Sequence, residues 1–491
     1  MRNAFARILQ FAAAAFTLLI APLFAIESRV FDQDPDIWWH IRVGDWITEH
    51  HAVPRFGIFS QHIERPWVAY SWLFDVLVSA AHKMFGLPGI PGLLICLEVL
   101  LSLVFLLAIV RIAGSFWWAW WIASAAIFAY FVNPLRPVLF TLLFFTLELL
   151  LIFESERRRD DKLLYWMGPL FVLWANCHIQ FVYGIAVLGL YLATRILSLL
   201  VGRLRLDESP TASAAKLIGF FGIAVVGSCI GPNGWLPYKV AFEYAGQTFV
   251  YQIVVEMHAM DFRRPEHFVE LLLLMAACFA IGRSGRRDLF RTMLLIVAAI
   301  VSFRSMRDAW FVSMAAAFVI AEAVRERESN ATAEGASDRR IWEPIGYAAA
   351  VSVALALSFG FAIRRDISTP ALINDIDGVY PIRATEFVRE SNLQGPMYNS
   401  FNWGGFLIFN LRDQPVSIDP RTDLYGDDGV RRSVATTDAI NWQADPDLLR
   451  ANFVLVERKF PLASALANDP GYRLVYQDHL ATVFVKQPHA P

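Results

Sequence analysis

Apolar runs of roughly twenty residues recur along most of this chain, and each is long enough to cross the ~30 Å hydrocarbon core of a bilayer. Of the 491 residues, 56% are hydrophobic and only 18% are charged, whereas soluble globular proteins carry about 25% charged residues. The sequence therefore predicts an α-helical polytopic membrane protein.

Lysine and arginine in short loops mark the cytosolic side of a membrane protein. Residues 71–85 decide how the chain is threaded, because they are short for a span and contain Asp75, His82 and Lys83. If this segment is an amphipathic helix on the membrane surface, four basic loops fall on one side. These loops are residues 154–162, 202–206, 282–288 and 325–340.

This threading predicts about eleven membrane helices, with the N-terminus in the cytosol and the C-terminus outside. We expect a membrane domain over residues 1–363, which includes a first outer loop at 27–89, and a soluble domain over 364–491. The expected spans are residues 7–26, 90–110, 116–132, 138–153, 163–175, 181–200, 216–230, 267–282, 289–301, 309–324 and 342–361.

The C-terminal stretch alternates short apolar runs with stretches typical of helices. The runs "PVSID", "NFVLVE", "YRLVYQD" and "ATVFVK" are separated by segments such as "ATEFVRESN" and "DPDLLRAN". This alternation predicts a small α/β domain, which the threading places in the periplasm of a bacterium, beyond the inner membrane.

Several function classes lack their residues. The net charge of −2 gives no field that would attract nucleic acid. The four cysteines lie in apolar runs without paired spacing, which argues against a metal site or a disulfide framework. Neither a "GxxxxGK[ST]" nor an "HExxH" pattern is present, so ATP-driven transport and zinc proteolysis are not indicated.

Polar residues of unusual variety gather in the loops expected on the outer side. Each has a structural alternative: helix capping for the acids, an interfacial belt for the tryptophans, and snorkelling for the arginines. Ionisable groups near membrane level nevertheless favour function. The candidates are Asp34, Asp36, Trp39, His40, Arg42, Arg136, Asn176, His178, Arg304 and Arg307.

These residue types suit group transfer at a membrane surface. A carboxylate after the first span can act as a general base. Arginines match the oxygens of a phosphate and stabilise charge on a phosphate leaving group.

The motifs resemble a group of bacterial polytopic proteins within the GT-C superfamily of membrane glycosyltransferases. The chain carries that group's first-loop pattern "DPDxWWHxxxGxWI", an "RPxxF" turn, a "WANxH" turn, and a "YNSFNWGGFLI…IDxRTDLYG" tail. The resemblance covers nearly the whole chain. It departs after the "WANxH" turn, where relatives commonly have two glycines and this chain has Ile179 and Gln180.

The resemblance implies a GT-C-like fold and a polyprenyl-phosphate-linked sugar donor. Asp34 or Asp36 would be the base, and Arg304 or Arg307 would bind phosphate, together with Arg136 or His178. A divalent metal is left open, although no ligand set is evident in the sequence, so no cofactor is certain.

The function expected is inverting transfer of a sugar to a periplasmic glycan, lipid or protein. The alternatives are a non-enzymatic carrier or scaffold for lipid-linked glycans and a ligase that uses a polyprenyl diphosphate donor. The tail motif is expected to form a strand, a glycine-containing turn, a helix, a second strand over "VSID" and an acidic loop over "RTDLYG". Gly404 and Gly405 could form the tight turn. Asp419, Arg421 and Asp423 could contact the acceptor glycan or form a structural ion-pair cluster.

Overall fold

The computed structural model describes residues 2–27, 31, 34–130, 134–200, 213–284, 288–331 and 344–487. The chain folds into two compact units, and each unit is built from three segments that are separated in sequence. Unit one comprises Met1–Glu27, Gly92–Trp235 and Val254–Arg365, and unit two comprises Ser28–Pro91, Leu236–Ile253 and Asp366–Pro491.

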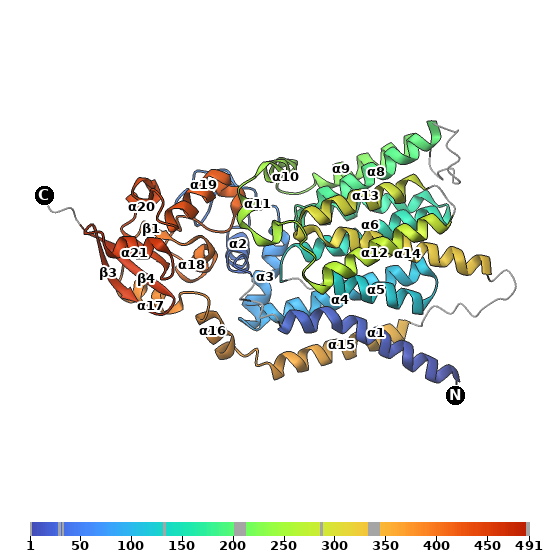
Figure 1. Ribbon diagram of the computed structural model, residues 1–491, viewed down its shortest axis with the longest axis horizontal. Coiled ribbons are helices and arrows are strands. Elements are labelled where there is room, and N and C mark those ends of the chain that lie inside the picture. Colours follow the sequence, from blue (N-terminus) through green and yellow to red (C-terminus); the bar gives the residue numbers. More distant parts are fainter. Residues whose placement is uncertain are drawn as a thin grey trace. The chain divides into compact units, whose positions relative to one another are not determined.

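Unit one is a helical bundle (Figure 1). A helix is found at each of the eleven spans expected from the sequence, which confirms that part of the prediction. They are α1 (Arg2–Glu27), α4 (Gly89–Ala113), α5 (Phe116–Tyr130), α6 (Val138–Arg158), α7 (Met167–Cys177), α8 (Phe181–Leu200), α9 (Ala214–Ser228), α12 (Pro265–Ser284), α13 (Leu289–Arg304), α14 (Trp310–Ala331) and α15 (Pro344–Arg364).

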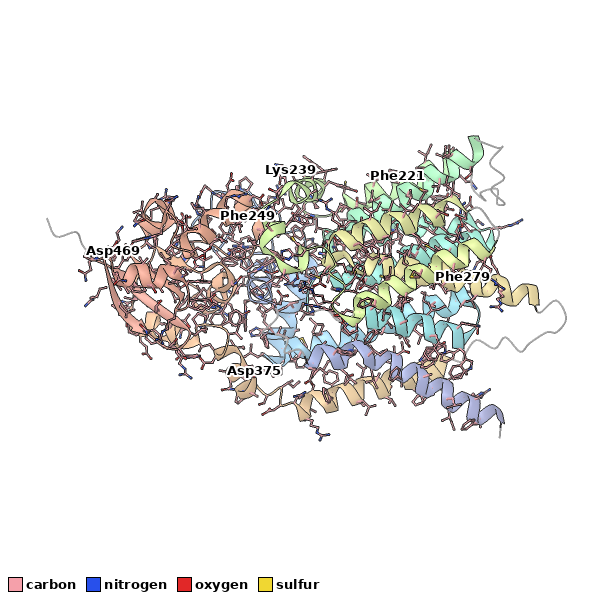
Figure 2. The ribbon with its side chains drawn as sticks, viewed as in Figure 1. Phe221, Lys239, Phe249, Phe279, Asp375 and Asp469 are labelled. Atoms are coloured by element: carbon pink, nitrogen blue, oxygen red, sulfur yellow. The ribbon has the colours of Figure 1, made fainter. Side chains whose placement is uncertain are left out.

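Six helices of the described chain, α1, α4, α6, α8, α12 and α15, are long and apolar enough to cross a membrane. Large apolar side chains also face outward from the bundle; Phe279 of α12 is 68% exposed (Figure 2). Such exposure would be costly in water and is expected in lipid. The chain is therefore a multi-pass membrane protein with a C-terminal α/β region, as predicted.

The direction of threading remains a prediction. One of the four basic loops, residues 202–206, lies outside the described residues, as do most of 325–340 and the centre of 282–288. The same holds for the ends of two expected spans, at residues 131–132 and 342–343.

Unit two combines short helices with a four-stranded sheet of order β1-β2-β4-β3. Strand β1 runs parallel to β2, and the other neighbours are antiparallel. The elements are α2 (Ile37–His50), α3 (Trp72–Phe85), α10 (Leu236–Gly246), α11 (Val250–Ile253), α16 (Thr369–Asp377), α17 (Ile382–Glu390), β1 (Met397–Asn399), α18 (Gly404–Asn410), α19 (Thr422–Thr437), α20 (Pro446–Arg450), β2 (Phe453–Glu457), α21 (Pro461–Ala467), β3 (Tyr472–Gln477) and β4 (Ala481–Lys486).

Two expectations for the tail were wrong. The run "PVSID" is not a strand: Val416 forms only an isolated bridge with Ser60, and the next backbone amide, of Ser417, bonds to the Asn399 side chain instead of a sheet ladder. The segment "RTDLYG" was expected to be an acidic loop, but α19 begins at Thr422. The Asn399 side chain thus takes the place of a neighbouring strand at "PVSID", and "RTDLYG" forms the start of α19 instead of a loop.

The first loop folds as part of unit two. Helix α2 packs along α3, and the two backbones approach so closely that a Cβ at Gly44 would lie 2.0 Å from the Asp75 carbonyl oxygen. The ring of Trp38 on α2 is buried against Tyr380 and Phe406. The helix expected at residues 71–85 is confirmed as α3; its place on the membrane surface remains a prediction.

Candidate functional site

The acidic pair of the first loop forms a small turn ahead of α2. Asp34 is only 1% exposed, and its Oδ1 accepts a hydrogen bond from the Asp36 amide at 3.0 Å. Asp36 is half-buried, and its Oδ1 accepts from the Trp39 indole nitrogen at 3.1 Å. Asp36 sits at the N-cap of α2 but its side chain makes no capping hydrogen bond, so the capping alternative does not explain it.

His40 is joined to an aspartate on the neighbouring helix. Its Nδ1 lies 2.5 Å from Oδ1 of Asp75 on α3, and both side chains are buried. Burial raises the pKa of Asp75, and the hydrogen bond from His40 acts in the opposite direction. The contact with Asp75 and the edge-on packing against Phe74 together fix the orientation of the His40 ring. In the sequence, Asp75 stood out only as a polar residue in an apolar helix.

Arg42 lies in a second group of charges. Its guanidinium is 5.1 Å from the centre of the Phe59 ring and 3.4 Å from Oδ2 of Asp45. Arg42 and Asp45 are both buried. Asp45 also accepts a hydrogen bond from Ser79 at 2.7 Å, which ties this group to α3.

The tail motif packs directly on the acidic turn. A Cβ at Gly405 would lie 2.5 Å from the Pro35 carbonyl oxygen and 3.3 Å from Cδ1 of Trp39. Gly404, its neighbour, has ordinary helical backbone angles. The need for glycine at position 405 is therefore one of close approach, rather than the tight turn that the sequence suggested.

Unit two also contains a buried ion pair. The guanidinium of Arg421 bonds to both carboxylate oxygens of Asp419 at 2.8 Å and lies over the Trp67 ring. Tyr425 donates to the same carboxylate at 2.7 Å. This is the ion-pair alternative weighed for the tail, and contact with an acceptor remains a prediction.

Asp423 belongs to the same region but is only half-buried. It accepts a hydrogen bond from the indole of Trp67 at 2.9 Å. Burial raises the pKa of Asp423 to about 7, although the charge of Arg421 opposes the shift. We call Asp34, Asp36, His40, Asp75, Trp67, Asp419, Arg421, Asp423 and Tyr425, all in unit two, the first-loop cluster.

The remaining candidates lie in unit one, at the turns between its helices. Arg136, just before α6, donates through Nη1 to both carboxylate oxygens of Glu256, at 2.8 and 2.7 Å. Glu256 lies in a short 3-10 helix, Val255–Met257. The positive charge of Arg136 is therefore already matched by a carboxylate.

The "WANxH" turn is fixed by hydrogen bonds. The Thr141 hydroxyl accepts from the Trp174 indole at 2.9 Å, and it lies 2.8 Å from Nδ1 of His178. Its own proton can then go to His178, which would leave the imidazole proton on Nε2. Asn176 donates to the carbonyl oxygens of Val172 and Ile230 and so holds the end of α7.

The turn between α13 and α14 carries the last two arginines. Arg304 is exposed at the end of α13, whereas Arg307 is half-buried and acts electrostatically on Asp308. Gln180, two residues after His178, donates to Oδ1 of Asp308 at 2.9 Å. Sequence reasoning missed Asp308 and gave Gln180 no role.

We call Arg136, Glu256, Thr141, His178, Gln180, Arg304, Arg307 and Asp308 the turn cluster. Burial raises the pKa of Asp308, against the opposing charge of Arg307. In the described part of the chain, no group of three or more His, Cys, Asp or Glu side chains is arranged to hold a metal ion.

Comparison with known proteins finds likeness to solved structures but to no family model. No family model matches the chain, and no curated protein matches it. Among solved structures, the chain is similar to the crystal structure of ArnT from Cupriavidus metallidurans bound to undecaprenyl phosphate. The sequence identity is 13%, the TM-score is 0.47, and 97% of each chain is covered. The assignment of a chemistry to this chain therefore rests on its own residues and motifs.

Proposed function

We propose that this protein is an inverting glycosyltransferase of the bacterial inner membrane. It would transfer a sugar from a polyprenyl-phosphate donor to a periplasmic glycan, lipid or protein. The observation that carries the proposal is the half-buried carboxylate of Asp36, held by the Trp39 indole at the point where the tail motif packs on the first-loop motif.

In the proposed step, a hydroxyl of the acceptor loses its proton to the Asp36 carboxylate. The hydroxyl oxygen forms a bond to the anomeric carbon of the sugar, on the face opposite the phosphate. The bond from that carbon to the phosphate oxygen breaks, and its electron pair leaves on the polyprenyl phosphate. Attack from the opposite face inverts the anomeric configuration.

Asp36 is the better candidate for the base because a base must come within hydrogen-bond reach of the hydroxyl. The Asp34 side chain is buried and bonds to the Asp36 amide, which suits a positioning role. In the same framework, Trp39 orients the Asp36 carboxylate, and the His40 pair with Asp75 holds the start of α2.

Charge on the departing phosphate calls for cations, and the motif resemblance assigns this role to Arg304 or Arg307, together with Arg136 or His178. Arg307 and Arg304 are the accessible guanidinium groups of the last turn. His178 would present its Nε2 proton, as argued above, and Arg136 would contribute after leaving Glu256. Asn176 would keep the "WANxH" turn in place.

The decisive variant is Asp36→Asn, which removes the base while keeping the shape of the side chain. General-base catalysis typically contributes roughly 10²–10⁴-fold, so we expect kcat to fall by that order while the protein elutes as the wild type does. Asp34→Asn should cost less, and Asp413→Asn, at an exposed position of unit two, should keep full activity. Full activity in Asp36→Asn would refute the assignment of the base.

The donor can be identified from the lipids that co-purify with the protein. The wild type is compared with the double variant Arg304→Ala/Arg307→Ala. Polyprenyl monophosphate that is bound by the wild type and lost in the variant would support the proposal. A diphosphate-linked glycan would instead indicate the ligase. Bulk phospholipid alone in both samples would contradict a donor site and favour the non-enzymatic carrier or scaffold.

A further inference from the structure

A group of cations gathers around Asp45 in unit two, apart from the residues assigned to the transfer step. Lys83 Nζ lies 3.2 Å from Oδ1 of Asp45. The Arg42 guanidinium is 3.4 Å, and that of Arg412 4.0 Å, from its Oδ2. We call these four residues the Asp45 cluster. Three cations face one carboxylate, so the group carries a surplus of two positive charges.

The cations differ in accessibility. The side chains of Lys83 and Arg412 are 46% and 56% exposed, whereas those of Arg42 and Asp45 are buried. Arg42 Nε has no hydrogen-bond partner among the described residues. His82, the neighbour of Lys83, has its pKa lowered mainly by burial, with Arg412 and Lys83 acting in the same direction and Asp45 against it. The charge that the cluster presents to its surroundings therefore comes from Lys83 and Arg412.

The chain next to these cations is apolar and exposed. Met84 and Phe85, the last two residues of α3, are 71% and 65% exposed. Exposed apolar side chains next to lysine and arginine are typical of a helix that lies in a membrane interface.

Covalent geometry places this end of α3 beside a membrane span. Helix α4 begins at Gly89 and is long and apolar enough to cross the bilayer. Only three residues lie between Phe85 and Gly89, so the two are within about 14 Å of each other. The two are closer than this limit requires, because a Cβ at Gly89 would lie 3.1 Å from Cβ of Phe85 and 2.4 Å from the Ala81 carbonyl oxygen.

We infer that the Asp45 cluster binds the phosphate of an anionic phospholipid headgroup at the end of α4. Met84 and Phe85 enter the lipid interface, and Lys83 and Arg412 pair with the phosphate above them. The argument does not use the proposed transfer reaction, and its test does not measure transfer.

The test counts phospholipids retained by the full-length protein in detergent, by native mass spectrometry, after addition of phosphatidylglycerol or phosphatidylcholine. Each basic residue near an anionic surface is worth about 1 kcal/mol, so the loss of two in Lys83→Gln/Arg412→Gln should weaken retention of phosphatidylglycerol roughly thirtyfold. Lys239→Gln, on α10 (Figure 2), removes an exposed lysine from the same unit and should retain it as the wild type does.

A purely structural role for the cluster predicts something different, and Asp45→Asn separates the two. This change breaks the same ion pairs but leaves the cations, so headgroup binding requires retention that equals or exceeds that of the wild type. Weaker retention in Asp45→Asn, or equal retention in the wild type and the double variant, would overturn the inference. Displacement of phosphatidylglycerol by millimolar inorganic phosphate would also overturn it, in favour of a free anion.

Discussion

The first-loop cluster of unit two and the turn cluster of unit one both collect charged residues, but they hold them in different ways. In the first-loop cluster, Arg421 and Asp419 are fully buried and bonded to each other at 2.8 Å. In the turn cluster, Arg136 is paired with a Glu256 side chain that is 39% exposed, and Arg304 is exposed.

The difference shows which charges can exchange partners. A buried ion pair is expensive to separate, because either partner alone would be left as an uncompensated charge. The Arg136–Glu256 pair is partly exposed, with side chains 17% and 39% exposed, so it costs less to separate. The first-loop cluster is therefore suited to hold a base in a fixed geometry, and the turn cluster is suited to release cations to a charged ligand.

The largest expected effect is on the buried pair. Arg421→Met should reduce the free energy of unfolding by about 3–5 kcal/mol, because it leaves Asp419 buried without a cation. Arg304→Met, at an exposed site, should stay within about 0.5 kcal/mol of the wild type. The free energies of unfolding of both variants can be measured by chemical denaturation in detergent, with limited proteolysis of unit two as the readout. Equal losses in the two variants would remove the contrast between the clusters.

The close approach of the tail to the acidic turn comes next. Gly405→Ala puts a methyl group 2.5 Å from the Pro35 carbonyl oxygen, and overpacking of this kind typically costs about 1–3 kcal/mol. Gly246→Ala is the matched control, since a Cβ there meets nothing within 4 Å. A shift in melting temperature for Gly405→Ala no larger than that of the control would show that the two motifs are not tightly joined.

The pH dependence of stability sharpens the same comparison. The pKa of Asp423 is about 7 in the folded protein and near 3.9 in an unfolded chain. The folded state therefore binds more protons between these values, and stability falls as pH rises from 4 to 7. The melting temperature should drop more from pH 5 to pH 8 in the wild type than in Asp423→Asn. Equal drops in melting temperature in the wild type and in Asp423→Asn would mean that the pKa of Asp423 is not raised in the folded protein.

The smallest effect is expected at the turn cluster. Glu256→Gln removes the carboxylate that holds Arg136, and exposed pairs are worth up to about 1 kcal/mol. Freeing the guanidinium should therefore raise the affinity for a polyprenyl phosphate by roughly two- to fivefold. Equilibrium binding of the lipid to the two proteins measures this. Weaker binding by Glu256→Gln would show that the pair supports the site instead of competing with it.

Much of the fold could be predicted because its determinants are local. A run of apolar residues specifies a membrane helix wherever it occurs, and alternating apolar residues identified β2, β3 and β4. The failure at "PVSID" has a long-range cause: Val416 meets Ser60, a residue in a different part of the chain. No pattern within five residues contains that information.

The candidate site was predictable in its members but not in its connections. Asp34, Asp36 and His40 stood out as polar residues between apolar runs. The partners that define their geometry, Asp75 and Gly405, come from segments that appeared amphipathic or turn-forming. The signal available for Asp75 was a carboxylate near the start of the amphipathic segment 71–85, since such a group requires a partner when it is buried.

The assembly of unit two from three separated stretches has a consequence for biosynthesis. The first loop leaves the ribosome early, but its covering residues, including Phe406 over Trp38, are made only after nearly all the helices of unit one. At ~5–20 residues per second, that interval is on the order of tens of seconds. The first loop must spend it incomplete, with aromatic surface uncovered, so translation that stops before α18 would yield a membrane-inserted chain open to proteolytic quality control.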